Sequence, residues 1–171
     1  MLVEGEFPRR IGEEIFFLEI GLENGDADVV KIAIEHGAVI DNPERYKHMA
    51  YVKTTMQDYF NGMIGREFTR EDIEIIKILF ENGADTSYKL RVHYYSNAFG
   101  MAVWGILYND GVVTDDELEF IQVIIDNGVT HDDALILMED LSSNYHFSDE
   151  YHSDITKDDN YYLLMEMIEN K

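Results

Sequence analysis

The chain has 171 residues, 46% of them hydrophobic, which suffices for a folded core and argues against a disordered acidic tail. It contains no cysteine, which excludes disulfides, cysteine-ligated zinc and thiol catalysis. Acidic residues outnumber basic ones by 35 to 13, and a net charge of −22 repels nucleic acid and anionic membranes while attracting basic protein surfaces. Because no apolar segment has the character of a signal peptide or membrane span, we expect a cytoplasmic protein.

Apolar residues at helical spacing predict a nearly all-α chain. The predicted helices span residues 11–23, 28–36, 44–60, 70–82, 96–108, 115–127, 132–141 and 160–170. Thr69 followed by Asp72 has the pattern of a capping box, Thr114 should cap the helix at 115–127, and Asp132 or Asp133 the helix after it. Residues 142–159 form a polar segment that we expect to be a long loop.

The helix at 70–82 recurs along the chain. Its apolar pattern returns at residues 28–36 and 115–127, and more weakly at 160–170, where Glu166 stands at an apolar position. The first three copies close on Gly37, Gly83 and Gly128, which predicts a left-handed backbone at each glycine. A period near 45 residues indicates a stack of helical repeats.

Two of these copies, VVKIAIEHGA at 29–38 and IIKILFENGAD at 75–85, resemble the second helix and turn of an ankyrin repeat. The ankyrin period is about 33 residues, and its first-helix signature T-P-L-H-x-A is absent here. The resemblance implies one ankyrin-like solenoid domain over residues 1–171, with about four helix pairs and lengthened repeats. A HEAT-like array, with a period of about 40–47 residues, is the structural alternative.

The same resemblance implies a binding scaffold whose second helices are buried, which leaves residues 38–46, 84–97 and 129–133 for contact with a partner. Of these, only 84–97 joins several aromatic side chains to an acid: Asp85, Tyr88, Tyr94 and Tyr95. Tyrosines are frequent binding hot spots, so these four residues are the predicted partner-binding site.

The segment from His146 to Asp154 holds His146, Asp149, Glu150, His152 and Asp154, which could serve a metal or acid–base chemistry. The two histidines are six residues apart, which suits neither a helical nor a strand pair of ligands, so a solvated acidic loop is the simpler interpretation. The nucleotide-binding, zinc-protease and serine-hydrolase motifs are all absent. We therefore predict no enzyme activity, no cofactor and no metal.

Three functions fit these observations. The first is an acidic interaction protein that neutralises a partner with a basic surface, as a toxin-immunity protein or a phage anti-defence inhibitor does. The second is a duplex DNA mimic, which needs carboxylates gathered on one face, whereas the acids here are spread over every helix. The third is a metal-dependent enzyme built on residues 146–154. We favour the first, with a protein as the partner.

Overall fold

The computed structural model describes residues 13–46, 54–64, 66–86, 98–109, 111–142 and 155–171, and all regular elements in these ranges are helices. In chain order they are α1 (Glu13–Asn24), α2 (Ala27–Glu35), α3 (Pro43–Tyr46), α4 (Thr55–Met63), α5 (Arg70–Glu81), α6 (Ala98–Asn109), α7 (Asp115–Asp126), α8 (His131–Ser142) and α9 (Asp159–Glu169). The predicted all-α class is confirmed.

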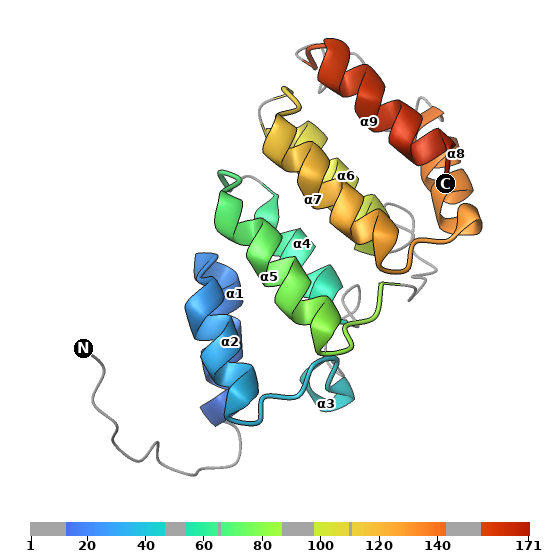
Figure 1. Ribbon diagram of the computed structural model, residues 1–171. Coiled ribbons are helices and arrows are strands. Elements are labelled where there is room, and N and C mark those ends of the chain that lie inside the picture. Colours follow the sequence, from blue (N-terminus) through green and yellow to red (C-terminus); the bar gives the residue numbers. More distant parts are fainter. Residues whose placement is uncertain (1–12, 47–53, 65, 87–97, 110, 143–154) are drawn as a thin grey trace.

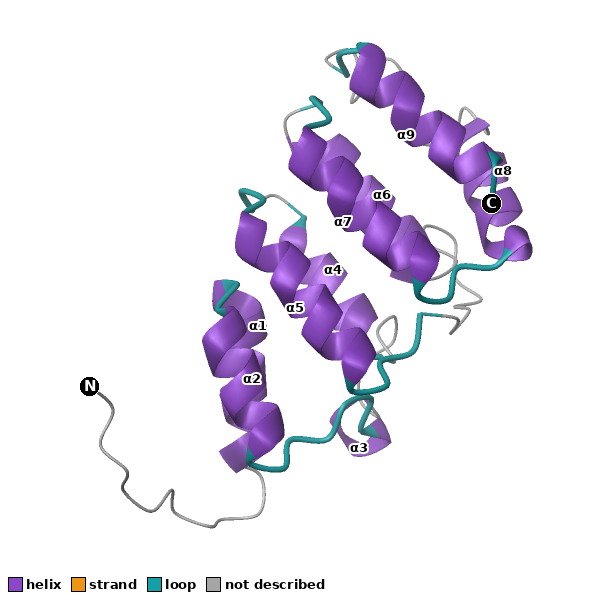
Figure 2. Ribbon diagram, viewed as in Figure 1, coloured by secondary structure: helices purple, strands orange, loops and turns teal. Residues whose placement is uncertain are grey.

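The helices stand in two rows (Figure 1). The front row consists of α2, α5, α7 and α9, each packed against the next, and the rear row of α1, α4, α6 and α8. The short helix α3 lies beside the connection from α2 to α4, and the described part of the chain contains no strand (Figure 2). Each helix of the front row thus packs on the next helix of that row, whereas described helices adjacent in the sequence pack closely only within the pairs α1–α2, α6–α7 and α8–α9.

The core lies between the two rows and between successive helices of the front row. The α5 side chains Ile75, Ile76 and Leu79 are completely buried, as are Ile121 and Ile124 of α7. Aromatic rings join neighbouring helix pairs, because the Phe120 ring of α7 lies 5.8 Å from that of Phe60 in α4 and 5.2 Å from that of Phe68 before α5. Edge-to-face contacts of this kind stabilise a packed core beyond the area they bury.

Four helices are preceded by a threonine that is hydrogen-bonded to the residue three positions later. Thr69 and Asp72 at α5, and Thr114 and Glu117 at α7, form the capping boxes, the first of them as predicted. Thr54 and Gln57 form another at α4, and the Asp133 carboxylate accepts the backbone N–H of Thr130 before α8.

Two sequence-based predictions of helix starts are therefore wrong. The helix predicted at 44–60 is not continuous, because Thr54 is extended at φ −128° and starts α4, which then continues through Asn61 and Gly62 to Met63. The cap of α8 is Thr130 rather than Asp132 or Asp133. Asp133 instead occupies the third helical position, where its carboxylate answers the threonine.

The ends of the repeated helices are built alike. Gly37, Gly83 and Gly128 have φ values of +103°, +85° and +138°, which confirms the predicted left-handed turns. The side chains of Asn82 and Asn127, just before two of these glycines, donate to the carbonyl four residues earlier. Asn170 stands at the same position after α9, so the fourth copy keeps the helix end although it lacks the glycine.

Candidate partner-binding surface

The structure places only one of the four predicted site residues. Asp85 is exposed in the turn after α5, and its backbone N–H donates to the Asp41 carboxylate over 2.7 Å. Tyr88, Tyr94 and Tyr95 lie outside the described residues, so their role in binding stays a prediction.

The turns after the repeated helices form a continuous edge. The Asp41 carboxylate accepts the backbone N–H groups of Asp85 and of Thr55, at the start of α4, which ties the first turn to the second. The second turn meets the third at Gly128, where an added β-carbon would lie 3.4 Å from the hydroxyl of Thr86. Asp85 therefore belongs to a row of turns, and its neighbour in this row is another carboxylate.

The front row exposes a second surface that the predicted binding site does not include. The resemblance implies buried second helices, but each repeated helix exposes one stripe to solvent. The exposed residues at helical spacing are Asp28, Lys31 and Glu35 on α2, Glu71, Glu74 and Glu81 on α5, Asp115, Glu119, Gln122 and Asp126 on α7, and Asp159, Tyr162, Glu166 and Glu169 on α9. These stripes, the front face, lie on the side away from the rear row.

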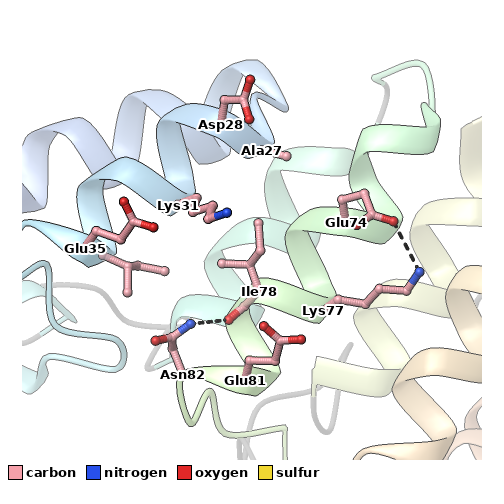
Figure 3. Close-up of a pocket in the computed structure, with 10 residues that line it drawn as sticks. Ala27, Asp28, Lys31, Glu35, Glu74, Lys77, Ile78, Glu81 and Asn82 are labelled. Atoms are coloured by element: carbon pink, nitrogen blue, oxygen red, sulfur yellow. Dashed lines mark hydrogen bonds and ion pairs between the residues drawn. The ribbon is translucent and has the colours of Figure 1, made fainter.

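A groove of about 530 Å³ separates α2 from α5 on this face (Figure 3). Ile34 and Ile78 form its apolar part, and the two lysines, Lys31 and Lys77, lie among four carboxylates. The Lys77 ammonium is 3.2 Å from the Glu74 carboxylate. Because both charge signs line it, this groove does not select strongly for a basic partner.

Ion pairs join α5 to α7 across the same face. The Arg70 guanidinium contacts the carboxylates of Asp116 at 2.9 Å and Glu119 at 3.3 Å, and Lys77 lies 3.8 Å from Glu119. All four side chains are substantially exposed, so each pair contributes little to stability. The basic residues of α5 therefore offset part of the acidic charge of α7.

Beyond α5 basic residues become rare. The chain carries no lysine or arginine between Arg91 and Lys157, and residues 92–171 hold 17 acidic and two basic side chains, which is −15 of the net −22. Neither α7 nor α9 contains a basic residue. The part of the front face formed by α7 and α9, here called the acidic face, thus carries exposed carboxylates and no lysine or arginine from either helix, and the missing lysines and arginines are its signal in the sequence.

A buried polar cluster lies at the start of α5. The fully buried Asp72 carboxylate accepts hydrogen bonds from the Tyr59 hydroxyl, from the Arg66 guanidinium at 2.5 Å and from the backbone N–H of Thr69 at 2.7 Å. Burial, then the negative charge of Asp72, raises the pKa of Tyr59. Burial alone would lower the pKa of Arg66, but its hydrogen bond and attraction to Asp72 outweigh this and raise it. Because each of these polar groups has a partner, the cluster links α4 and the loop before α5 to the start of α5.

Among the described residues, no three histidine, aspartate or glutamate side chains are placed to hold a metal ion. The candidate cluster at 146–154 lies outside those residues. No described helix exceeds 12 residues, so none of them could cross a bilayer.

Comparison with known proteins gives no assignment, since no protein-family model, no curated protein and no solved structure matches the chain.

Proposed function

We propose that the chain is an ankyrin-like solenoid that binds a basic partner protein and neutralises its activity. The two rows of packed helices and the shared ends of the repeated helices support the solenoid, and an array of this kind is a general scaffold for binding. The functional classes that fit are toxin-immunity proteins and phage anti-defence inhibitors, which both work by covering an active surface.

The observation that carries the proposal is the distribution of charge. The acidic face holds carboxylates of two adjacent helices without a lysine or arginine in either helix. A surface of one sign attracts an opposite surface before contact and raises the association rate, and it disfavours partners of like charge. The predicted site around Asp85 and the tyrosines 88, 94 and 95 adds aromatic contacts to this electrostatic attraction.

The proposal is tested by affinity capture from the organism that encodes the chain, at low salt, followed by release at high salt and an assay of the captured protein. We expect a protein with a basic surface whose activity is lost when the chain is present at equal concentration. Toxin immunity and anti-defence then differ only in whose activity is blocked.

Two results would contradict the proposal. One is a captured partner that keeps full activity with the chain bound, which would make the chain a scaffold. The other is a partner that binds equally well at low and high salt, which would remove electrostatic recognition. If the partner instead binds duplex DNA and the chain competes with that DNA, the chain acts as a DNA mimic.

A further inference from the structure

The helix α9 exposes a leucine at a position that α5 and α7 bury. Counted back from the helix-end residues Asn82, Asn127 and Asn170, Leu163 corresponds to Ile75 and Phe120. Those two side chains are 0% exposed, whereas Leu163 is 45% exposed. Leu163 is thus an exposed apolar side chain on the surface of α9.

Tyr162, the residue before Leu163, is aromatic where the other copies carry an acid. Asp28, Glu74 and Glu119 occupy the position of Tyr162 in the other copies, and all three are exposed carboxylates. Tyr162 is 60% exposed, and its ring meets the half-buried ring of Tyr161 edge to face at 5.5 Å. An aromatic side chain thus stands in solvent where the repeat otherwise carries an acid, and a ring contact restricts it.

Both ends of α9 are fixed to α7, so this exposure belongs to a packed helix. At the first end, the Asn160 amide donates to the Val113 carbonyl and to the Asp115 carboxylate, each over 3.0 Å. At the other end, the Lys171 ammonium donates to the Ile125 carbonyl over 2.9 Å. Tyr162 and Leu163 are therefore held in place before any partner arrives, which lowers the entropic cost of binding.

The surroundings of this apolar pair are acidic. Glu166 and Glu169 are exposed on α9 itself, and Glu119 and Asp126 are exposed on the neighbouring α7. A central apolar contact within a polar rim is the usual anatomy of a protein interface. Among these four acids, Arg70 and Lys77 pair only with Glu119, so the rim keeps an excess of carboxylates that favours a basic partner.

We propose that Tyr162 and Leu163 anchor the partner, and that the occupant is a segment of a basic protein with apolar side chains flanked by lysine or arginine. This inference rests on the proposed function and places the contact on the acidic face. A second copy of this chain is a poor occupant, because two acidic faces would meet with like charges. Binding should seat the partner's apolar side chain against Tyr162 and Leu163 and its basic side chains against Glu166 and Asp126.

The test uses a synthetic amphipathic peptide of about 18 residues, with leucine on one helical face and lysine on the other, titrated into isotope-labelled full-length chain. A peptide with glutamate in place of lysine is the control for charge. Leu163→Ala and Tyr162→Ala are compared with Leu135→Ala, a matched control because Leu135 is 49% exposed on α8 in the rear row. All three side chains are exposed, so the thermal melting of each variant should stay near that of the parent.

We expect the backbone amide signals of residues 159–166 and 115–126 to shift with the lysine peptide. Leu163→Ala and Tyr162→Ala should each weaken binding about fivefold to tenfold, while Leu135→Ala changes it less than about twofold.

Two other results have separate meanings. If the lysine peptide binds but shifts signals of α2 or α8 instead, or if Leu135→Ala weakens binding as much as Leu163→Ala, the anchor is wrong and the proposed function survives. If the glutamate peptide binds as well as the lysine peptide, recognition of a basic partner fails, and the anchor fails with it.

Discussion

At the residue scale, the Asp72 carboxylate joins three segments of the fold. It serves the capping box of α5, and it also joins the helix start to Arg66 in the preceding loop and to Tyr59 in α4. The sequence indicates the first role, because Thr69 and Asp72 have capping spacing. It does not indicate the other two, since only the packing of α4 against α5 brings Tyr59 and Arg66 to the carboxylate.

This difference predicts unequal losses of stability. Asp72→Asn removes the charge opposite Arg66 and should lower the free energy of unfolding by about 3 kcal/mol, because it leaves a partly buried guanidinium without its counter-charge. Thr114→Ala removes only the capping hydroxyl of α7 and should cost about 1 kcal/mol. Urea unfolding monitored by circular dichroism measures both. Equal losses would mean that the contact with Arg66 adds nothing.

The raised pKa of Tyr59 predicts a loss of stability in alkali. In the unfolded chain this phenol ionises near its usual pKa of about 10, whereas in the folded protein it keeps its proton. The unfolded state therefore binds fewer protons above that pH, and stability falls by up to about 1.4 kcal/mol per pH unit.

Tyr59→Phe removes this contribution. Its free energy of unfolding should fall less steeply than that of the parent between about pH 10 and 11. The other tyrosines and lysines titrate in both proteins, so the difference between the two slopes reports Tyr59 alone. Parallel curves would show that Tyr59 ionises as easily in the fold as outside it.

At the scale of elements, the sequence predicts the ends of the first three repeated helices better than the starts of α4 and α8. The ends depend on single residues, such as Gly83, whose conformation no neighbour has to impose. The start of α4 was missed because apolar residues continue at helical spacing from Tyr46 to Phe60 and conceal the break. The Thr54–Gln57 pattern was visible, but periodicity alone does not show that the helix begins there.

Gly83 and Gly62 both have open surroundings, so substitutions at these positions test backbone strain without steric clash. A β-carbon would meet nothing within 4 Å at Gly83 or at Gly62, but only Gly83 has a positive φ. Gly83→Val should therefore destabilise the protein by roughly 1 kcal/mol or more, because a β-branched residue resists the left-handed conformation. Gly62→Ala in α4 should stabilise it by about 0.5 kcal/mol. Thermal melting checks both signs, and a neutral Gly83→Val would contradict the proposed helix cap.

At the scale of the whole molecule, the sequence predicts the all-α class and the order of packing, but not which surface is exposed. The apolar pattern shows which helices must be packed against other helices on most sides. It does not show that α9 packs on α7 so as to leave Leu163 in solvent, because that depends on the orientation of one helix against another. The uneven distribution of charge is visible in the sequence. Only the structure shows that the acidic helices α7 and α9 lie side by side.

The uneven charge predicts that position matters more than total charge for association. The triple variant Glu119→Gln, Asp126→Asn, Glu166→Gln neutralises the acidic face, and Glu23→Gln, Asp28→Asn, Glu35→Gln neutralises as many exposed acids on α1 and α2. Stopped-flow association with the lysine peptide at low salt should slow severalfold for the first variant and much less for the second. Equal slowing would indicate steering by the net charge alone.

The packing of helices mainly against their neighbours has one further consequence. In the proposed solenoid, stability is close to a sum of local terms, so one helix pair can open while the others stay closed. The pair α8 and α9 contacts the rest mainly through α6 and α7. A partner seated on α9 would act as an added neighbour for that pair, and recognition and local folding would then be the same event.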